Sequence, residues 1–260
     1  MNAPQSDEVD DHVVADLARE HPGLRLPEVV VVIAAYNEAA GLPRVLASLP
    51  EEVCGLPVGV LVVDDGSTDG TAAAARAAGR GLVVVCPVNR GQGRALRLGY
   101  RIAREHGAAY VVTTDADGQY SPDEIAEVLA PVVEGRADFV SGSRRLGSLE
   151  NRDAVRQAGT YVFAWLASLL LGQRITDTSF GLRAMRAEVT AAVRLDQPQY
   201  QASELLVEVF AHGFRYAEVP ATMRVRSAGS SKKGGNLVYG ARYGRVMLGT
   251  WWRDGRPRAR

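Results

Sequence analysis

Five short apolar runs, each followed by a stretch rich in alanine, arginine or glutamate, constrain the fold of this chain most. The runs are Val29–Ala34, Val58–Val63, Leu82–Val85, Tyr110–Thr113 and Asp138–Ser141. Continuous apolar runs are typical of strands that are buried on both faces of a sheet. Helices are expected between them, over Ala39–Leu49, Gly70–Ala78, Gly93–Glu105 and Pro122–Val133. This alternation predicts an α/β fold with a mostly parallel, Rossmann-like sheet flanked by helices.

The alternation stops after residue 145, and mostly helical segments follow. The expected elements are a helix over Asp153–Leu171, a turn region over Thr176–Gly181, a helix over Gln201–Ala211, a strand over Tyr216–Val219 and a helix over Asn236–Trp252. These segments predict a C-terminal helical elaboration of the α/β domain. The helix over Asp153–Leu171 is apolar on all sides, which suits either a core helix or a lipid-facing one.

Charge is balanced over the whole chain but not along it. The 260 residues carry 30 basic and 30 acidic side chains, so a global basic field for nucleic acid is excluded. Residues 1–28 hold seven acids and two bases, whereas residues 221–260 hold ten bases and one acid. We therefore divide the chain into a flexible acidic arm (1–27), one domain (28–235) and a basic amphipathic segment (236–260). The sequence contains no recognisable signal peptide or membrane span, which predicts a cytoplasmic location.

Polar clusters follow four of the predicted strands. They are Ala34–Glu38, Asp64–Gly70, Asn89–Arg94 and Asp115–Gln119. Ligands of open α/β sheets bind at the carboxyl ends of the strands, so we expect these clusters to converge on one binding site. A single acidic turn would need no such explanation, because Asp and Gly are ordinary turn residues.

Asp115 and Asp117 stand two residues apart, which on an extended strand end directs both carboxylates to the same side. Together with the Gln119 amide oxygen they form an oxygen-only set that suits Mg²⁺ or Mn²⁺. An Asp-x-Asp pair also occurs in phosphatases of the haloacid-dehalogenase type. That chemistry usually has an apolar residue or threonine where this chain has Gln119, so it is disfavoured.

Several of these motifs resemble known sequences when they are taken in order. Val32–Glu38, Val62–Thr71 and Asp115–Gln119 together resemble the family 2 glycosyltransferases of GT-A fold. Later motifs are similar to the branch of dolichol- or polyprenyl-phosphate mannose synthases. These are Ser141–Arg144, Asp177–Arg183 and Arg226–Asn236. The resemblance covers about residues 28–237, so the domain over 28–235 is expected to be a GT-A glycosyltransferase domain.

The resemblance implies roles for individual residues. The nucleotide-sugar contacts that it implies are Ala34, Tyr36, Glu38, Val63, Asp65, Asp115, Ala116 and Asp117. It puts the metal at Asp117, with Asp115 and Gln119 as further ligands. The catalytic groups would be Asp117, Arg144, Arg226 and Lys232, and the acceptor phosphate would meet Arg144 and Arg156. The family commonly has lysine in the glycine-rich turn where this chain has Gln92 and Arg94.

The function that the resemblance implies is inverting transfer of a hexose from GDP-mannose or a UDP-hexose to a polyprenyl phosphate. A lipid phosphate is already ionised at neutral pH, so that reaction needs no general base. A hydroxyl acceptor, soluble or on a polysaccharide, would need one, and Asp177 is then a candidate base; its alternative role is a turn carboxylate. A non-catalytic nucleotide-sugar sensor is the third possibility, and the intact aspartate pair argues against it.

The acceptor would bring the protein to a membrane surface. Residues Arg226–Gly235 combine glycines with basic side chains, which predicts a mobile lid over phosphates. Trp251 and Trp252 stand beside Arg253 and further arginines, a pattern that suits the headgroup region. We expect peripheral contact with the inner face of the cell membrane; in the alternative, this helix packs on the body of the protein.

Overall fold

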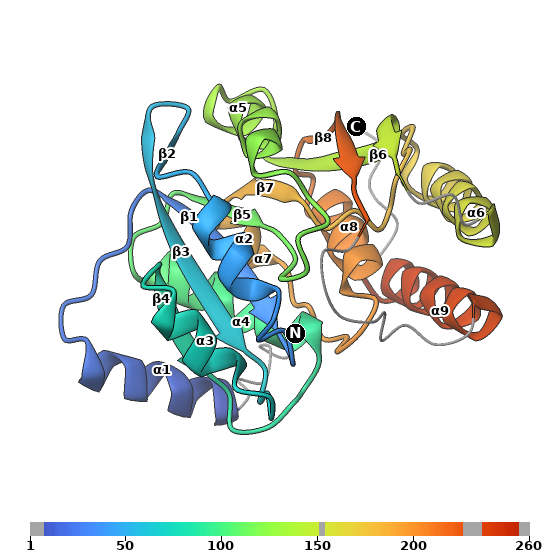
Figure 1. Ribbon diagram of the computed structural model, residues 1–260. Coiled ribbons are helices and arrows are strands. Elements are labelled where there is room, and N and C mark those ends of the chain that lie inside the picture. Colours follow the sequence, from blue (N-terminus) through green and yellow to red (C-terminus); the bar gives the residue numbers. More distant parts are fainter. Residues whose placement is uncertain (1–7, 151–153, 226–235, 255–260) are drawn as a thin grey trace.

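The computed structural model describes residues 8–150, 154–225 and 236–254, apart from the side chains of residues 154–157 and 236–239 (Figure 1). Within these residues the strands form one eight-stranded mixed sheet in the order β2-β3-β1-β5-β7-β6-β8, with β4 paired to β3. The strands are β1 (Val29–Ala35), β2 (Glu52–Val53), β3 (Leu56–Asp64), β4 (Leu82–Val85), β5 (Tyr110–Thr113), β6 (Phe139–Leu149), β7 (Arg183–Arg186) and β8 (Tyr216–Met223). The predicted α/β class with a Rossmann-like sheet is confirmed.

Helices cover both faces of the sheet. They are α1 (Glu8–Glu20), α2 (Leu42–Ser48), α3 (Thr71–Ala77), α4 (Gln92–Glu105), the 3₁₀ turn η1 (Pro122–Glu124), α5 (Ile125–Val133), α6 (Ala154–Leu171), α7 (Ala187–Ala192), α8 (Gln201–Ala211) and α9 (Asn236–Asp254). One core packs against α4, α7 and α8, and a second packs against α2 and α5. Alternate residues of β1 enter the two cores, Val30 and Val32 the first and Val31 and Ile33 the second. Its continuous apolar run therefore reflects burial on both faces.

Two parts of the sheet differ in strand direction. Strand β1 pairs in parallel with β3 and β5, and β3 pairs in parallel with β4. Strand β7 runs antiparallel between β5 and β6, while β6 and β8 are parallel to each other. The amino end of β7 consequently lies at the carboxyl end of β5 and beside Ser141 in the first part of β6, since Arg183 is opposite both Thr113 and Ser141.

The structure corrects three expectations. The N-terminal arm, predicted to be flexible over 1–27, contains helix α1, whose Leu17 is buried in the first core. Strand β7 was not predicted, because its sequence Arg-Ala-Met-Arg has no run of β-branched residues. Strand β6 continues to Leu149 rather than ending at Ser141, and its distal part pairs only with β8 beyond a register shift.

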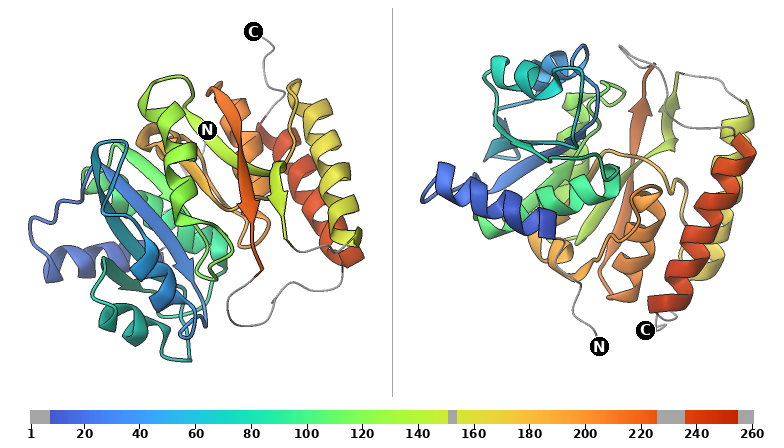
Figure 2. Two further views of the ribbon diagram at one scale, coloured as in Figure 1. Left: turned by 45° about the horizontal axis from the view of Figure 1, so that its top comes forward. Right: turned by 90° about the horizontal axis from the view of Figure 1, so that it is seen from below.

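Helices α6 and α9 form the C-terminal elaboration. They lie side by side next to the β6–β8 edge, whereas α1 lies beside α4 at the other end of the molecule (Figure 2). Tyr243 and Met247 of α9 are buried in the first core, so this helix packs on the body. Within the described ranges, no helix is both long and apolar enough to cross a membrane.

Candidate active site

The loops after β1 and β3 are joined by hydrogen bonds at the carboxyl end of the sheet. Ala35 is opposite Asp64 in the strand register, and the Asp65 N–H donates to the Ala35 carbonyl over 2.8 Å. Asn37 has a φ of 53°, which lets its side chain accept a bond from the Thr68 N–H at 2.9 Å. The two predicted polar clusters therefore form one rigid wall, in which Tyr36 and Glu38 are half-buried.

Asp65 organises the next loop along the chain. Its two carboxylate oxygens accept the N–H groups of Arg90 and Gly91 at 2.9 and 2.7 Å. Burial raises the pKa of Asp65 above its usual range, and the two backbone bonds oppose this rise by stabilising the charged form. Asp65 thus ties the glycine-rich turn to the first wall of the site, a role that the sequence pattern does not reveal.

The acidic pair follows β5, as predicted. Asp117 is 5% exposed, and its Oδ1 accepts the Gln119 N–H at 3.0 Å. Asp115 is half-buried, and its Oδ1 accepts a bond from the Gln92 side-chain amide at 3.0 Å. Gln92 lies in the glycine-rich turn, in which the family resemblance leads us to expect a lysine. Its side chain links this turn to the acidic pair.

The donor set of the acidic pair fits a divalent cation that also binds a ligand. Among the described residues, no group of three or more His, Cys, Asp or Glu side chains could hold a metal by itself. Two carboxylates at a strand end match the usual binding of Mg²⁺, which takes one or two protein carboxylates plus substrate phosphates. Gln119, the third expected ligand, donates through its side-chain nitrogen to the Arg224 carbonyl at 3.1 Å. This bond fixes the amide at the end of β8.

Strand β7 brings the segment before it to the same edge of the sheet. We call this edge, at the carboxyl ends of β1, β3 and β5, the rim. The Gly181 N–H donates to the Tyr120 hydroxyl at 2.9 Å, and its carbonyl accepts from the Thr113 hydroxyl at 2.8 Å. A Cβ atom at Gly181 would lie 2.9 Å from Oδ2 of Asp115 and 2.8 Å from the Tyr120 hydroxyl oxygen. A side chain at this position would have to displace the Tyr120 ring or the Asp115 carboxylate, so Gly181 packs directly against the acidic pair's loop.

Arg144 is held at this rim by Asp177. The Arg144 Nε lies 2.5 Å from Oδ2 of Asp177, its Nη2 lies 3.3 Å from Oδ1, and Nη2 also contacts the Ser179 hydroxyl at 3.1 Å. The Asp177 side chain is 0% exposed and that of Arg144 is 14% exposed. Burial alone would lower the pKa of Arg144, but the Asp177 carboxylate raises it above its ordinary value. Arg144 therefore stays charged, with its guanidinium 5.6 Å from the centre of the Phe180 ring.

Glu218 supports this pair from β8. Its carboxylate accepts the N–H groups of Thr176 and Asp177, both at 2.9 Å, and the Tyr216 hydroxyl at 3.0 Å. This role of Glu218 was not predicted from the sequence. The available signal was a carboxylate within the apolar strand over Tyr216–Val219, since a charge there needs a buried partner.

Three expected site residues lie outside what the structure describes. Arg226 and Lys232 fall in residues 226–235, as does the predicted lid. Arg156 belongs to α6, but its side chain lies outside the described residues. The other residues that are expected to contact the nucleotide sugar lie at or beside the rim. Among them, Val63 and Ala116 are buried and Ala34 is half-buried.

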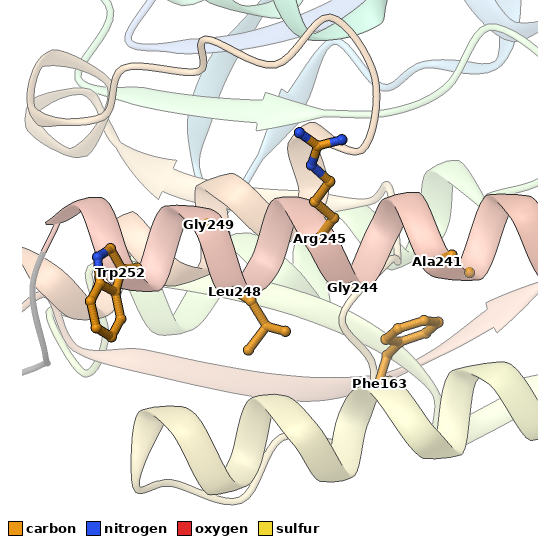
Figure 3. Close-up of a pocket in the computed structure, with 8 residues that line it drawn as sticks. Phe163, Ala241, Gly244, Arg245, Leu248, Gly249 and Trp252 are labelled. Atoms are coloured by element: carbon orange, nitrogen blue, oxygen red, sulfur yellow. The ribbon is translucent and has the colours of Figure 1, made fainter.

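An apolar surface lies beside the rim on α6 and α9. Its exposed side chains are Tyr161, Val162, Trp165 and Leu169 on α6, and Leu248 and Trp252 on α9. Figure 3 shows a groove along α9 in which Leu248 and Phe163 face the space between the two helices. Helix α6 is thus neither wholly core nor wholly exposed, since Ala164 and Ala167 on its other face are 0% exposed.

The sheet order and the Asp-Ala-Asp turn at its rim define a glycosyltransferase of the GT-A class. The model of Glycosyl transferase family 2 matches residues 30–194, more than half of the chain, and the chain belongs to that family. The chain is 34% identical to an undecaprenyl-phosphate mannosyltransferase of Micrococcus luteus, over 81% of this chain and 89% of that protein. It is 33% identical to a dolichyl-phosphate hexose transferase of Haloferax volcanii, over 79% and 86%.

A solved structure has a similar fold. It is glucosyl-3-phosphoglycerate synthase from Mycobacterium tuberculosis in complex with Mn²⁺, uridine diphosphate and glucosyl-3-phosphoglycerate. The TM-score is 0.66 at 21% identity, and the match covers 96% of this chain and 86% of that one. The similarity confirms the GT-A fold predicted from the sequence.

Proposed function

We propose that this chain is an inverting glycosyltransferase that moves a hexose from a nucleotide sugar to a polyprenyl phosphate. The donor would be GDP-mannose or a UDP-hexose, bound with Mg²⁺ or Mn²⁺. The names of the Micrococcus and Haloferax relatives support a polyprenyl phosphate acceptor, and the observation that carries the proposal is the buried Arg144–Asp177 pair beside the acidic pair.

This arrangement suits a phosphate acceptor better than a hydroxyl. Asp177 already accepts bonds from Arg144 and from the Ser179 N–H, and its side chain is 0% exposed. A general base must reach the proton that it removes, so Asp177 is poorly placed for that role. Arg144, by contrast, offers a fixed positive charge at the rim, and guanidinium groups bind phosphate well.

The chemistry is then a single displacement. A phosphate oxygen of the lipid attacks the anomeric carbon, the bond from that carbon to the diphosphate oxygen breaks, and the nucleoside diphosphate leaves with the electron pair. No proton has to move, because the attacking phosphate is already ionised. Asp117 and Asp115 would hold the cation, whose charge offsets that of the departing diphosphate. Arg144 adds positive charge that is fixed before the reaction begins.

The donor would lie against the wall formed by the loops after β1 and β3. In this proposal the nucleotide meets Ala34, Tyr36, Glu38, Val63 and Asp65, and the diphosphate meets Asp115, Ala116 and Asp117. Arg156, Arg226 and Lys232 keep the phosphate-binding roles that the family resemblance implies.

The proposal includes peripheral contact with the inner face of the cell membrane. The exposed side chains on α6 and α9 form an apolar surface beside the rim, and Trp165 and Trp252 are 66% and 81% exposed. Tryptophan suits the membrane interface, where an apolar ring and a polar N–H are both satisfied. Because the polyprenyl chain stays in the bilayer, this surface would bring Arg144 to the lipid phosphate.

The proposal is tested by incubating the purified protein with a panel of labelled nucleotide sugars, Mn²⁺ and undecaprenyl phosphate in detergent. We expect label from one donor to enter the organic phase, and excess EDTA to stop the transfer. Metal-dependent transfer to a water-soluble or polysaccharide hydroxyl instead would favour the alternative acceptor class. Donor binding without turnover on any acceptor would favour a nucleotide-sugar sensor.

A further inference from the structure

Helix α1 carries a buried carboxylate that contacts two arginines. Asp10 is 4% exposed, with its Oδ1 2.6 Å from Nη2 of Arg90 and its Oδ2 2.9 Å from Nη2 of Arg97. Burying a carboxylate is costly unless it is paired. A helix that served only to cover the core could do so through Leu17 alone, so Asp10 calls for a separate explanation.

Arg90 connects this helix to the active site. Its side chain is held by Asp10, while its backbone N–H is held by Asp65 at 2.9 Å. Gly91, the next residue, donates to the other oxygen of Asp65, and Gln92 donates to Asp115 at 3.0 Å. Three consecutive residues thus join α1 to an expected nucleotide contact and to the acidic pair.

The opposite side of this turn is also packed. Gly91 has a φ of +93°, and a Cβ atom on it would lie 2.4 Å from the Pro198 carbonyl oxygen. The Gly93 N–H donates to the same carbonyl at 3.1 Å. The turn is therefore held from one side by the loop before α8, and from the other side by Asp65 and Asp10.

We propose that Asp10 is a positioning residue for the nucleotide-sugar donor, which makes α1 part of the donor site. This inference rests on the proposed function, and it concerns a segment that precedes residues 30–194, the part matched by the family model. Removing the Asp10 carboxylate would take away the negative charge that lies between the Arg90 and Arg97 guanidinium groups. Their repulsion would displace the turn that Asp65 and Gln92 depend on.

The expected effect is on binding rather than on the chemical step, because Asp10 does not touch the reacting atoms. In Asp10→Ala we expect the Kd of the nucleoside diphosphate and the KM of the donor to rise by about tenfold. We expect kcat at saturating donor to change by less than about twofold. Asp10→Glu keeps a carboxylate and should recover part of the affinity.

Asp11→Asn is the matched control. Asp11 lies on the same helix and contacts Arg101 of α4 at 2.6 Å, and its side chain is 43% exposed. Arg101 lies about two to three turns further along α4 than Gln92, so this ion pair is separate from the one that Asp10 makes with Arg90. The control should therefore bind nucleotide with an affinity within about twofold of the wild type.

The experiment is calorimetric titration of GDP and UDP with Mn²⁺ into the full chain, wild type and variants, well below their unfolding temperatures. A weaker Kd in Asp10→Ala, an unchanged one in Asp11→Asn and partial recovery in Asp10→Glu support the inference. If Asp10→Ala has a lower Tm but the wild-type Kd, Asp10 is only structural and the inference is wrong. If the wild type binds neither diphosphate, the proposed function fails as well.

Discussion

The two ends of the sheet are built in different ways. At the β4-β3-β1-β5 end all four strands are parallel, and their loops are closed by bonds to backbone N–H groups, such as those that Asp65 accepts. At the β7-β6-β8 end one strand is reversed, and the site depends on contacts between distant side chains. Arg144 and Asp177 are 33 residues apart, and Asp177 and Glu218 are 41 apart.

The difference matches the two substrates of the proposed reaction. A nucleoside diphosphate is polar and charged, so a wall of preformed backbone N–H donors and carboxylates suits it. A lipid phosphate arrives from a membrane, so its side of the site needs a fixed cation next to an apolar surface. Arg144 and the exposed residues of α6 and α9 provide these two features.

Among substitutions at the parallel end of the sheet, loss of Asp117 should reduce transfer activity most. We expect Asp117→Ala to reduce transfer by about 100-fold or more, because a metal's stabilisation of the departing diphosphate is worth several kcal/mol. The circular dichroism spectrum and Tm should remain close to those of the wild type. Asp123→Ala, which removes a nearby exposed carboxylate, is the control and should keep its activity. Wild-type turnover in Asp117→Ala would contradict the assignment of the metal site.

Substitutions of the Arg144–Asp177 pair test the β7-β6-β8 end of the sheet. Arg144→Met leaves Asp177 buried without its cation and should destabilise the fold by about 3 kcal/mol, as broken buried pairs do. Arg144→Met with Asp177→Asn should regain most of that stability, measured by urea unfolding. Transfer should fall by about 100-fold in both proteins, because the cation at the rim is missing in each.

Asp177→Asn alone separates the two roles considered for this residue. If Asp177 only positions Arg144, the variant should lose part of its affinity for the acceptor and keep most of its kcat. A loss of kcat as large as that of Asp117→Ala would instead identify Asp177 as a general base.

The sequence predicted the strands β4, β3, β1 and β5 more completely than the β7-β6-β8 end, where β7 was missed and β6 and β8 extend beyond their predicted ends. The predicted runs Leu82–Val85 and Tyr110–Thr113 coincide with β4 and β5 at both boundaries, because the local sequence pattern alone determines these strands. Strand β7 carries two arginines in four residues and forms only because β5 and β6 flank it. The predicted roles of Asp115 and Asp117 follow from local spacing, whereas those of Glu218 and Asp10 depend on partners far away in the chain.

Helix α8 holds α9 through a buried carboxylate, and this contact should depend on pH. Glu208 is buried on α8 and accepts the Arg194 N–H at 2.6 Å, and its other oxygen lies 2.6 Å from Nη2 of Arg253 of α9. Burial raises the pKa of Glu208 to about 7, and its neighbours Glu204 and Asp254 add to the rise, whereas Arg253 opposes it. A carboxyl whose pKa is raised on folding stabilises the fold fully below its unfolded pKa, and this stability is lost as the pH rises towards 7.

Glu208→Gln removes this titration. We expect the wild type to lose stability relative to Glu208→Gln as the pH rises from about 5 to about 8, by as much as about 3 kcal/mol. Thermal unfolding at several pH values measures the change. Glu188→Gln, at an exposed site on α7, should show a pH dependence like that of the wild type. Parallel curves for Glu208→Gln and the wild type would show that Glu208 does not titrate in this range.

The smallest expected effect concerns the apolar surface. Trp165→Ser should reduce binding to anionic lipid vesicles several-fold, because an interfacial tryptophan contributes about 1–2 kcal/mol. Val88→Ser is the control, since Val88 is 54% exposed in the loop after β4, away from α6 and α9. Equal losses in the two variants, measured by vesicle co-sedimentation, would show that the surface on α6 and α9 has no special role in membrane contact.

The most direct test of the account compares two acceptors that differ only in the attacking group. Undecaprenyl phosphate and undecaprenol carry the same chain, so lipid affinity is matched while the phosphate is replaced by a hydroxyl. With the preferred donor and Mn²⁺, the account predicts transfer to the phosphate and none above background to the alcohol, because in the proposed mechanism Arg144 binds the phosphate and Asp177 does not act as a base. Transfer to undecaprenol at a comparable rate would contradict it.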